Sequence, residues 1–196
     1  MTHYYSEKQD SEEVKEEVRV ILNEEEYIFK SSSGVFSKKK LDNASKLLIE
    51  KAQIDEKDRV LDLGCGIGVI GIILKIVKPD IDITLSDVNE RALKLARENI
   101  EKYNVEGKVL KSDLFNNIEE EYNVILSNPP MVAGRDKSYQ LIRDSYKHLK
   151  TKGSIQIVAR HKKGGAMLEE KLKEVYGNCE VIGKGSGFRV YKSRKW

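Results

Sequence analysis

The chain has 196 residues, of which 39% are hydrophobic and 34% charged, and this composition is typical of one globular domain with a heavily charged surface. No apolar run approaches the roughly 18 residues of a membrane span, and the polar start of the chain, residues 1–10, does not resemble a signal or transit peptide. Neither of the two cysteines, Cys65 and Cys179, has the spacing of a metal ligand. We therefore expect a cytoplasmic protein without disulfides, metal or membrane association, and its oligomeric state stays open.

The small net charge of +3 hides an uneven distribution along the chain. Residues 1–30 hold nine acidic residues against four Lys or Arg, whereas residues 131–196 hold sixteen Lys or Arg against six acidic residues. A basic C-terminal third can attract a polyanion such as RNA, but a solvated surface with many ion pairs explains the same composition. The charge alone leaves both interpretations open.

The segment before residue 55 is expected to be an extension that packs on the main domain. Apolar residues recur at helical spacing over residues 11–22 and again over residues 41–53, which predicts two helices, and Tyr27–Phe29 is a short strand candidate between them. The predicted organisation is therefore an N-terminal extension, residues 1–54, and one globular domain, residues 55–196.

From residue 58 onward, strands and helices alternate, which predicts an α/β fold with a parallel sheet covered by helices on both faces. Glycines between the last two strands predict an antiparallel hairpin there. Strands are expected over Arg59–Leu63, Ile81–Ser86, Lys108–Lys111, Tyr122–Ser127, Ser154–Ala159, Cys179–Gly183 and Phe188–Lys192, and helices over Val69–Lys78, Asn89–Tyr103, Lys137–Leu149 and Gly164–Tyr176.

A glycine-rich segment, DLGCGIGVIG from Asp62 to Gly71, joins the first of these strands to its helix. Gly64, Gly66 and Gly68 let the backbone turn tightly and approach a bound ligand where a Cβ would be in the way. The helix behind them has unpaired N–H groups in its first turn. Because the segment also matches the dinucleotide pattern G-x-G-x-x-G, it predicts a nucleotide-containing ligand without specifying which one.

Acidic residues follow the strands at the same edge of the predicted sheet. Asp87 ends the second strand, near the separation of about 20 residues at which an acid meets a ribose. Asp113 follows the third strand, where it can contact an adenine amino group or cap the segment after it. Asp62 suits a cationic or amino-acid group and is a poor neighbour for a pyrophosphate. This favours S-adenosylmethionine (SAM) over NAD as the ligand.

The sequence Ser127-Asn128-Pro129-Pro130 follows the apolar fourth strand. Ligands of open α/β sheets bind beyond the carboxyl ends of the strands, so Asn128 is expected to face the ligand, on a backbone stiffened by two prolines. An NH₂ group donates two hydrogens, which the Asn128 side-chain carbonyl and the Pro129 backbone carbonyl can accept. The segment therefore predicts methyl transfer to an exocyclic amine, with catalysis by positioning at Asn128, Pro129 and Pro130.

Residues from about 33 to 196 resemble the methyltransferase small domain of RsmC-like class I methyltransferases, which modify guanine N2 in ribosomal RNA. The short segment His3-Tyr4-Tyr5-Ser6-Glu7 is similar to archaeal single-domain members of that group. The resemblance implies a seven-stranded, mostly parallel Rossmann-like sheet with an antiparallel last strand. It rests on Gly34-Val35-Phe36-Ser37 with Leu41-Asp42, the glycine segment, Ser86-Asp87-Val88, Ser127-Asn128-Pro129-Pro130 and Gly187-Phe188-Arg189-Val190-Tyr191.

The same resemblance implies SAM as the cofactor and assigns residues to it and to the substrate. Phe36 is expected to cover SAM or the target base. Met131 stands where many Asn-Pro-Pro enzymes have an aromatic residue that stacks on a flipped base. Phe36, Met131 and Phe188 are therefore the candidate substrate contacts, and the implied SAM contacts are Asp62, Gly64, Gly66, Gly68, Asp87, Val88, Asp113 and Leu114.

We expect a SAM-dependent amine methyltransferase that acts on RNA, with guanine N2 in ribosomal or transfer RNA as the target. A protein glutamine methyltransferase is the second hypothesis, since a glutamine amide presents the same NH₂. DNA adenine methylation lacks an evident recognition domain. A catalytically silent RNA-binding subunit is a further alternative, although both the SAM acids and Asn-Pro-Pro are intact, and a dehydrogenase ranks last.

Overall fold

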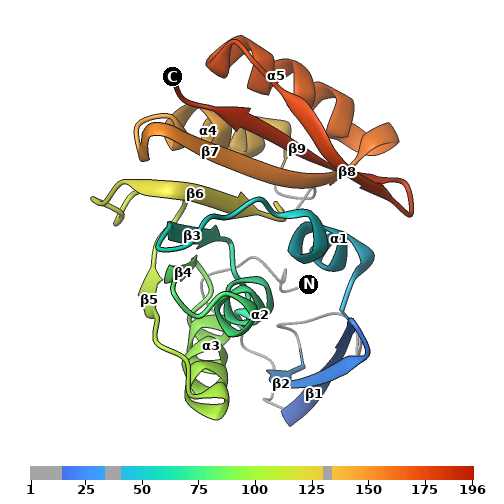
Figure 1. Ribbon diagram of the computed structural model, residues 1–196, viewed down its shortest axis with the longest axis vertical. Helices are drawn as coiled ribbons and strands as arrows, with labels where there is room; N and C mark the ends of the chain where they lie inside the picture. Colours follow the sequence, from blue (N-terminus) through green and yellow to red (C-terminus); the bar gives the residue numbers. More distant parts are fainter. Residues whose placement is uncertain (1–14, 34–40, 130–133) are drawn as a thin grey trace.

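A seven-stranded sheet forms the centre of the computed structural model, which describes residues 15–33, 41–129 and 134–196 (Figure 1). Its strands are β3 (Arg59–Leu63), β4 (Asp82–Asp87), β5 (Lys108–Lys111), β6 (Tyr122–Ser127), β7 (Leu149–Arg160), β8 (Glu180–Gly185) and β9 (Phe188–Arg194). The strand order is β5-β4-β3-β6-β7-β9-β8, in which β3 to β7 pair in parallel and β9 lies antiparallel between β7 and β8. This confirms the expected mostly parallel sheet with a reversed last strand.

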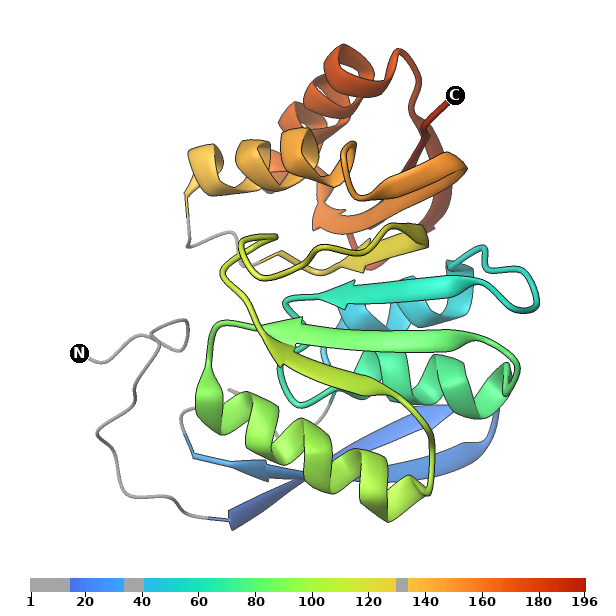
Figure 2. The same ribbon diagram turned by 90° about the vertical axis from the view of Figure 1, so that its left-hand side faces the viewer.

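Helices cover both faces of this sheet. Successive strand residues point to opposite sides, so each face packs its own hydrophobic core against the helices. Val60 packs in a core with the first three helices, whereas the next residue, Leu61, packs in a second core with the last two, and both side chains are fully buried. Figures 1 and 2 show these helices along the sheet. They are α1 (Asn43–Lys51), α2 (Val69–Val77), α3 (Glu90–Tyr103), α4 (Arg135–Ser145) and α5 (Ala166–Tyr176).

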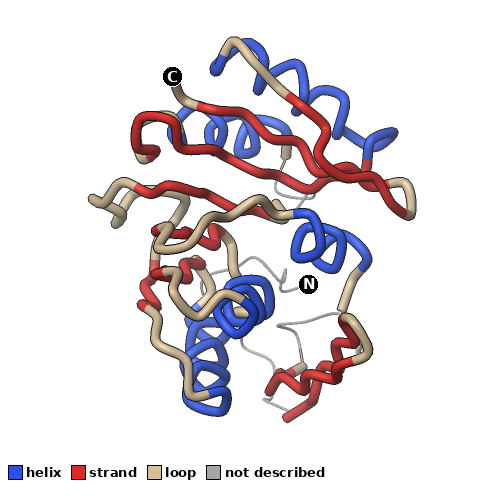
Figure 3. The backbone as a smooth tube through the Cα atoms, viewed as in Figure 1, coloured by secondary structure: helices blue, strands red, loops and turns tan. Residues whose placement is uncertain are grey.

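The helix expected over residues 11–22 is wrong: residues from Lys15 form a β-hairpin (Figure 3). Strand β1 (Lys15–Leu22) pairs antiparallel with β2 (Glu25–Ser32), and Asn23 and Glu24 between them both have positive φ, as the favoured two-residue hairpin turn requires. In β1 the buried residues Val18, Val20 and Leu22 alternate with exposed ones. Val18 and Leu22 fit both the helical and the alternating period, and the β-branched side chains of Val18 and Val20 favour the strand.

Two polar side chains of α3 hold this hairpin on the domain. Asn99 is fully buried and exchanges hydrogen bonds with the backbone of Lys30, at 2.8 and 3.1 Å, while its amide also donates to Ile67 O in the glycine loop at 3.0 Å. Tyr103 bonds the Ile28 backbone and packs on Phe29, with ring centroids 5.1 Å apart. Asn99 therefore links the hairpin directly to the loop that follows β3.

Several predicted boundaries in the C-terminal half differ from the structure: the strand expected over Ser154–Ala159 spans Leu149–Arg160, and the bounds of two helices are shifted. The helix expected to run to Leu149 ends at Ser145, because Leu149 pairs with Tyr122 and begins β7. The helix expected from Gly164 begins at Ala166, after an irregular turn in which Gly164 has a φ of +100°. Pairing with a neighbouring strand overrides the local helical spacing after Ser145.

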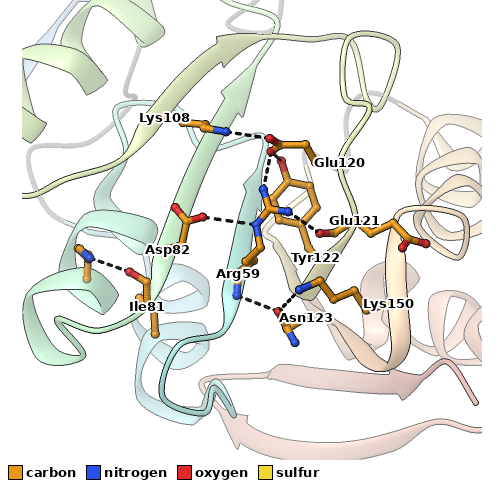
Figure 4. A network of polar contacts seen from close by, with 10 residues as sticks. Arg59, Ile81, Asp82, Lys108, Glu120, Glu121, Tyr122, Asn123 and Lys150 are labelled. Carbon is orange, nitrogen blue, oxygen red and sulfur yellow. Dashed lines mark hydrogen bonds and ion pairs between the residues drawn. The ribbon is translucent and has the colours of Figure 1, made fainter.

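A network of charged side chains lies at the edge of the sheet where the parallel strands begin (Figure 4). The Arg59 guanidinium lies 2.9 Å from Glu120 and 3.4 Å from Asp82, and Lys108 pairs with the same Glu120 at 2.8 Å. These side chains are partly exposed to solvent, which screens their charges, so each pair adds little to stability. Those of the residues singled out from the sequence that the structure describes lie at the opposite edge, where the parallel strands end.

Candidate functional site

The candidate site lies where the order of the parallel strands reverses. From β3 the chain continues to β4 and β5 on one side and then crosses to β6 on the other. The carboxyl ends of β3 and β6 are therefore adjacent, and Ser127 Oγ donates to Leu63 O across them at 2.8 Å. Such a switch point is where open α/β sheets bind ligands. The glycine loop leaves one of these strand ends and Asn128 the other.

Left-handed glycines build the loop between β3 and α2. Gly64, Gly66 and Gly68 have φ values of +77°, +55° and +88°, which residues with a Cβ rarely adopt. The backbone N–H groups of Gly64 and Cys65 donate to Ser86 O at 2.8 and 2.9 Å, so the loop is anchored to the end of β4. Gly64 is exposed, and a Cβ there would meet nothing within 4 Å. Its backbone can therefore be approached by a ligand.

Gly71→Ala should destabilise the protein more than Gly64→Ala. A Cβ on Gly71 would lie 2.3 Å from Leu85 Cδ2, and overpacking of this kind costs about 1–3 kcal/mol. At Gly64 the surroundings are open and only the left-handed backbone opposes alanine, at about 1 kcal/mol. Thermal unfolding of both variants checks this, and a lower melting temperature for Gly64→Ala would contradict it.

Asp62 is a buried carboxylate with one unused oxygen. The residue is 1% exposed, and its Oδ2 accepts from Gly71 N at 3.0 Å. Its Oδ1 is buried without a hydrogen-bond partner among the residues that the structure describes. Burial raises the pKa of this carboxyl group to about 7. A buried acceptor without a donor is costly, so Asp62 fits a ligand that brings a cationic or N–H group to it.

Asp87 lies against the same loop at the end of β4. Its Oδ2 accepts from Gly66 N at 2.8 Å and its Oδ1 from Asn89 N at 2.9 Å, and burial raises its pKa. Each carboxylate oxygen keeps a second acceptor site, so these bonds leave room for a ligand hydroxyl. The next residue, Val88, is half-buried. The structure thus brings Asp87 and the glycine loop together, as the sequence predicts.

Asp113 and Leu114 lie at the same edge, after β5, but farther towards the surface. Asp113 is exposed and its Oδ1 lies 2.7 Å from Lys137 Nζ at the start of α4. Residues 114–117 form a turn and no helix, so the alternative role of Asp113 as a helix cap is not supported. Leu114 is half-buried with a φ of +51°. A ligand contact by Asp113 would compete with its ion pair to Lys137.

Asn128, directly after β6, is half-buried, and Pro129 is buried. The Asn128 Nδ2 donates to Ser45 Oγ at 3.0 Å and to Asp42 Oδ1 at 3.3 Å. Sequence reasoning did not assign Asp42 or Ser45 to the site: their spacing indicates a helix cap, and no local pattern reports a contact across more than 80 residues. The predicted residues Phe36, Pro130 and Met131 lie outside the described part of the chain.

Phe188 lies beside Arg160 at the carboxyl end of β7. The two residues are paired across β7 and β9, and the Arg160 guanidinium lies 4.6 Å from the centroid of the Phe188 ring. Phe188 is half-buried and Arg160 is exposed. Because β6 and β7 are parallel neighbours, this pair lies at the same edge of the sheet as Asn128. A ring and a guanidinium together are surfaces on which a base can stack.

The described residues bear on three further features: a metal site, a reactive thiol and a membrane-spanning helix. They contain no group of three or more His, Cys, Asp or Glu side chains that could hold a metal ion. Cys65 is buried in the glycine loop, and burial raises its pKa far above the ordinary value, which disfavours the reactive thiolate. Within the same residues, no helix has the length and apolar character of a membrane span.

Comparisons with known sequences agree on one family. The model of the methyltransferase small domain family matches residues 26–192. The uncharacterized protein YbxB of Bacillus subtilis is 38% identical over 98% of both chains, so a relative of this length occurs in a bacterium. Ribosomal RNA small subunit methyltransferase C of Haemophilus influenzae is 37% identical over 82% of this chain, which spans about half (49%) of that relative's length.

Solved structures share the fold. The 16S rRNA N2 G1207 methyltransferase RsmC of Thermus thermophilus, in complex with AdoMet and guanosine, matches with a TM-score of 0.79 and 23% identity, over 93% of this chain and 51% of that one. A methyltransferase from Pyrococcus furiosus matches with a TM-score of 0.69 and 21% identity, over 77% of this chain and 81% of that one. The chain therefore belongs to the methyltransferase small domain family of SAM-dependent methyltransferases.

Proposed function

We propose that this protein transfers the methyl group of SAM to an exocyclic amine of RNA, with guanine N2 of ribosomal RNA as the target. One observation carries the proposal: Asn128 emerges at the switch point beside the glycine loop and Asp62, a buried carboxylate whose Oδ1 has no hydrogen-bond partner among the described residues. The names of the RNA methyltransferase relatives support RNA as the substrate and guanine as the base.

The residues present fit SAM as the cofactor. Asp62 would face the cationic amino-acid part, the backbone of Gly64, Gly66 and Gly68 would lie along the ligand, and Asp87 would accept from the ribose. Val88, Leu114 and Asp113 would line the adenine, the last of them after release from Lys137. When bound, SAM supplies a methyl group already activated by its sulfonium.

Asn128 and Pro129 would orient the substrate amine. The Asn128 Oδ1 and the Pro129 carbonyl are two acceptors on a rigid segment, and an NH₂ group that donates to both leaves its nitrogen lone pair free to face the methyl group. Positioning of this kind lowers the barrier without a strong base. Pro130 would stiffen the segment, and Phe36, Met131 or Phe188 would stack on the base.

The experiment that tests this function combines the protein with methyl-labelled SAM and an extract of the source organism that lacks the native enzyme. The product is then digested separately with RNase and with protease. Label released by RNase, and found as N2-methylguanine after hydrolysis to nucleosides, supports the proposal. Label released only by protease would overturn it and support glutamine methylation, whereas an RNase-sensitive label in another base would correct the target.

RNA binding should weaken steeply with salt and depend on lysines near Phe188. Lys163 follows β7 and Lys184 lies on β8, and both are exposed at the edge of the sheet that holds Asn128. Lys163→Ala and Lys184→Ala should each reduce the slope of log K against log salt by about one. Lys108→Ala at the opposite edge is the control. A slope that falls equally in all three variants would contradict this location.

A further inference from the structure

Residues at the start of helix α1, distant in sequence, accept hydrogen bonds from the Asn128 carboxamide. Helix α1 begins after Asp42, whose carboxylate accepts from Ala44 N at 2.9 Å and Ser45 N at 3.0 Å. Ser45 is 6% exposed, and its Oγ donates to Asp42 Oδ2 at 2.8 Å. The Asn128 Nδ2 contacts both residues, at 3.0 Å to Ser45 Oγ and 3.3 Å to Asp42 Oδ1. These contacts make one chain of hydrogen bonds.

The chemistry of Asp42 fixes which group donates and which accepts in each of these hydrogen bonds. A carboxylate only accepts hydrogen bonds, so the one hydroxyl hydrogen of Ser45 is committed to Asp42. Towards Asn128, Ser45 can then only accept, and the adjacent Asp42 Oδ1 can only accept as well. The Asn128 group that faces them is therefore the NH₂ group. With the amide turned by 180°, the Asn128 carbonyl oxygen would face two acceptors without a hydrogen between them.

We propose that Asp42 and Ser45 are positioning residues, which fix the direction of the Asn128 carboxamide. Because the amide is planar, Oδ1 points away from these partners and is available to accept from the substrate amine. In the opposite direction Asn128 would present hydrogens to the hydrogens of that amine. The inference rests on the proposed function in one respect, that Asn128 holds the amine which is methylated.

Capping of α1 is the alternative role of Asp42, and Asp42→Asn separates the two. Asn caps helices about as well as Asp, so a purely structural role predicts an almost unchanged melting temperature and an unchanged kcat. If the carbonyl of the amide introduced at position 42 keeps the cap, its NH₂ group faces Ser45, and the hydroxyl then donates towards residue 128. The oxygen of residue 42 that keeps the cap still accepts towards residue 128, so the two partners of the Asn128 amide no longer select one direction. We therefore expect the Asn128 amide to lose its fixed direction and kcat to fall about 10- to 100-fold, with the Kd for SAM unchanged.

Reversal of the donor-to-acceptor direction in these hydrogen bonds should restore activity, which a merely structural role does not predict. Asn128→Asp alone places two carboxylates around one hydroxyl. In Asp42→Asn/Asn128→Asp the chain runs from the NH₂ group of residue 42 through Ser45 to the new carboxylate, which keeps an oxygen for the amine. We expect this double variant to exceed Asn128→Asp in kcat by about tenfold. A double variant no faster than Asn128→Asp would overturn the proposal.

Two further variants protect the test against a general loss of structure. Ser45→Ala removes the hydroxyl that joins Asp42 to Asn128, with a minimal change of volume. It should lower kcat but leave the affinity for SAM unchanged. Asn43→Ala changes an exposed neighbour at the first position of α1 and should leave kcat unchanged. An unaltered kcat in both Asp42→Asn and Ser45→Ala would overturn the proposal.

A structural readout complements the rates. Hydrogen exchange of the Asn128 side-chain NH₂ group, identified in the amide spectrum by its absence in Asn128→Ala, should be slow in the wild type and faster in Ser45→Ala. The rate assays use whichever amine the wild type is found to methylate. Failure of RNA as the substrate therefore shows in the wild type alone, whereas failure of the positioning role shows only in the comparison of variants.

Discussion

Asn128→Ala should lower kcat by about 100-fold or more while the Kd for SAM stays within about twofold of the wild-type value. The Asn128 side chain is held by Ser45 and Asp42 and makes no contact with the glycine loop among the described hydrogen bonds. Its loss removes an acceptor for the substrate amine and leaves the cofactor contacts in place. Single-turnover methylation and calorimetric titration with SAM measure the two quantities separately.

Asn123→Ala is the matched control for this experiment. Asn123 lies on the same strand, β6, but at its other end, where its Oδ1 accepts from Arg59 N at 3.0 Å and Lys150 Nζ at 3.2 Å (Figure 4). We expect this variant to lose some stability and to keep its kcat. Weakened SAM binding with retained turnover in Asn128→Ala would show that the roles are assigned wrongly.

Asp62→Asn should raise the Kd for SAM at least about 30-fold, because truncation of one partner of a buried charge pair costs roughly 2–5 kcal/mol. The wild-type affinity should also depend on pH. Burial raises the pKa of Asp62 to about 7, so the carboxyl group becomes protonated as the pH falls through this value and no longer attracts a cation. We expect the affinity to fall by up to about tenfold per pH unit below that point, and to do so less in Asp62→Asn.

The stability of the free protein should show the opposite dependence. The pKa of Asp62 is higher in the folded than in the unfolded state, so its contribution is fully present below the unfolded pKa and is lost as the pH rises through about 7. Stabilisation by SAM should therefore increase from about pH 6 to about pH 8. Asp58→Asn, at the amino edge of β3, is the control, since burial also raises the pKa of Asp58. Equal pH dependence of SAM binding in wild type and Asp62→Asn would contradict the assignment.

The strands and helices of the main domain could be predicted because each has a strong local signal. Strand β3 and strand β6 were predicted at their observed bounds, since short apolar runs end at glycines in one case and at Asn-Pro-Pro in the other. The β1–β2 hairpin was not, because Val18 and Leu22 fit both a helical and an alternating spacing. Asn23 in its turn was the available signal for a hairpin.

Some features of the candidate site could likewise be predicted from the sequence, and others could not. Asp62, the glycines and Asp87 could be named from the sequence because each lies at the end of a strand, and parallel strands end at one edge of a sheet. Their roles towards SAM, and that of Asn128 towards the substrate, stay predictions. The structure adds that Asp62 Oδ1 has no hydrogen-bond partner in the described part of the chain and that Asp113 is paired with Lys137.

The sequence by itself determined the α/β class and placed the candidate site residues at the carboxyl ends of the parallel strands, because these follow from local spacing and from the rule that parallel strands share a carboxyl edge. Only the tertiary structure decided that Asp42 and Ser45 stand behind Asn128. Their Asn128 contacts join residues 86 and 83 positions apart. Such contacts depend on how α1 packs beside the end of β6, and no local pattern in either segment specifies that packing. The direction of the Asn128 amide thus follows from tertiary hydrogen bonding alone, because only the neighbouring acceptors distinguish its oxygen from its nitrogen.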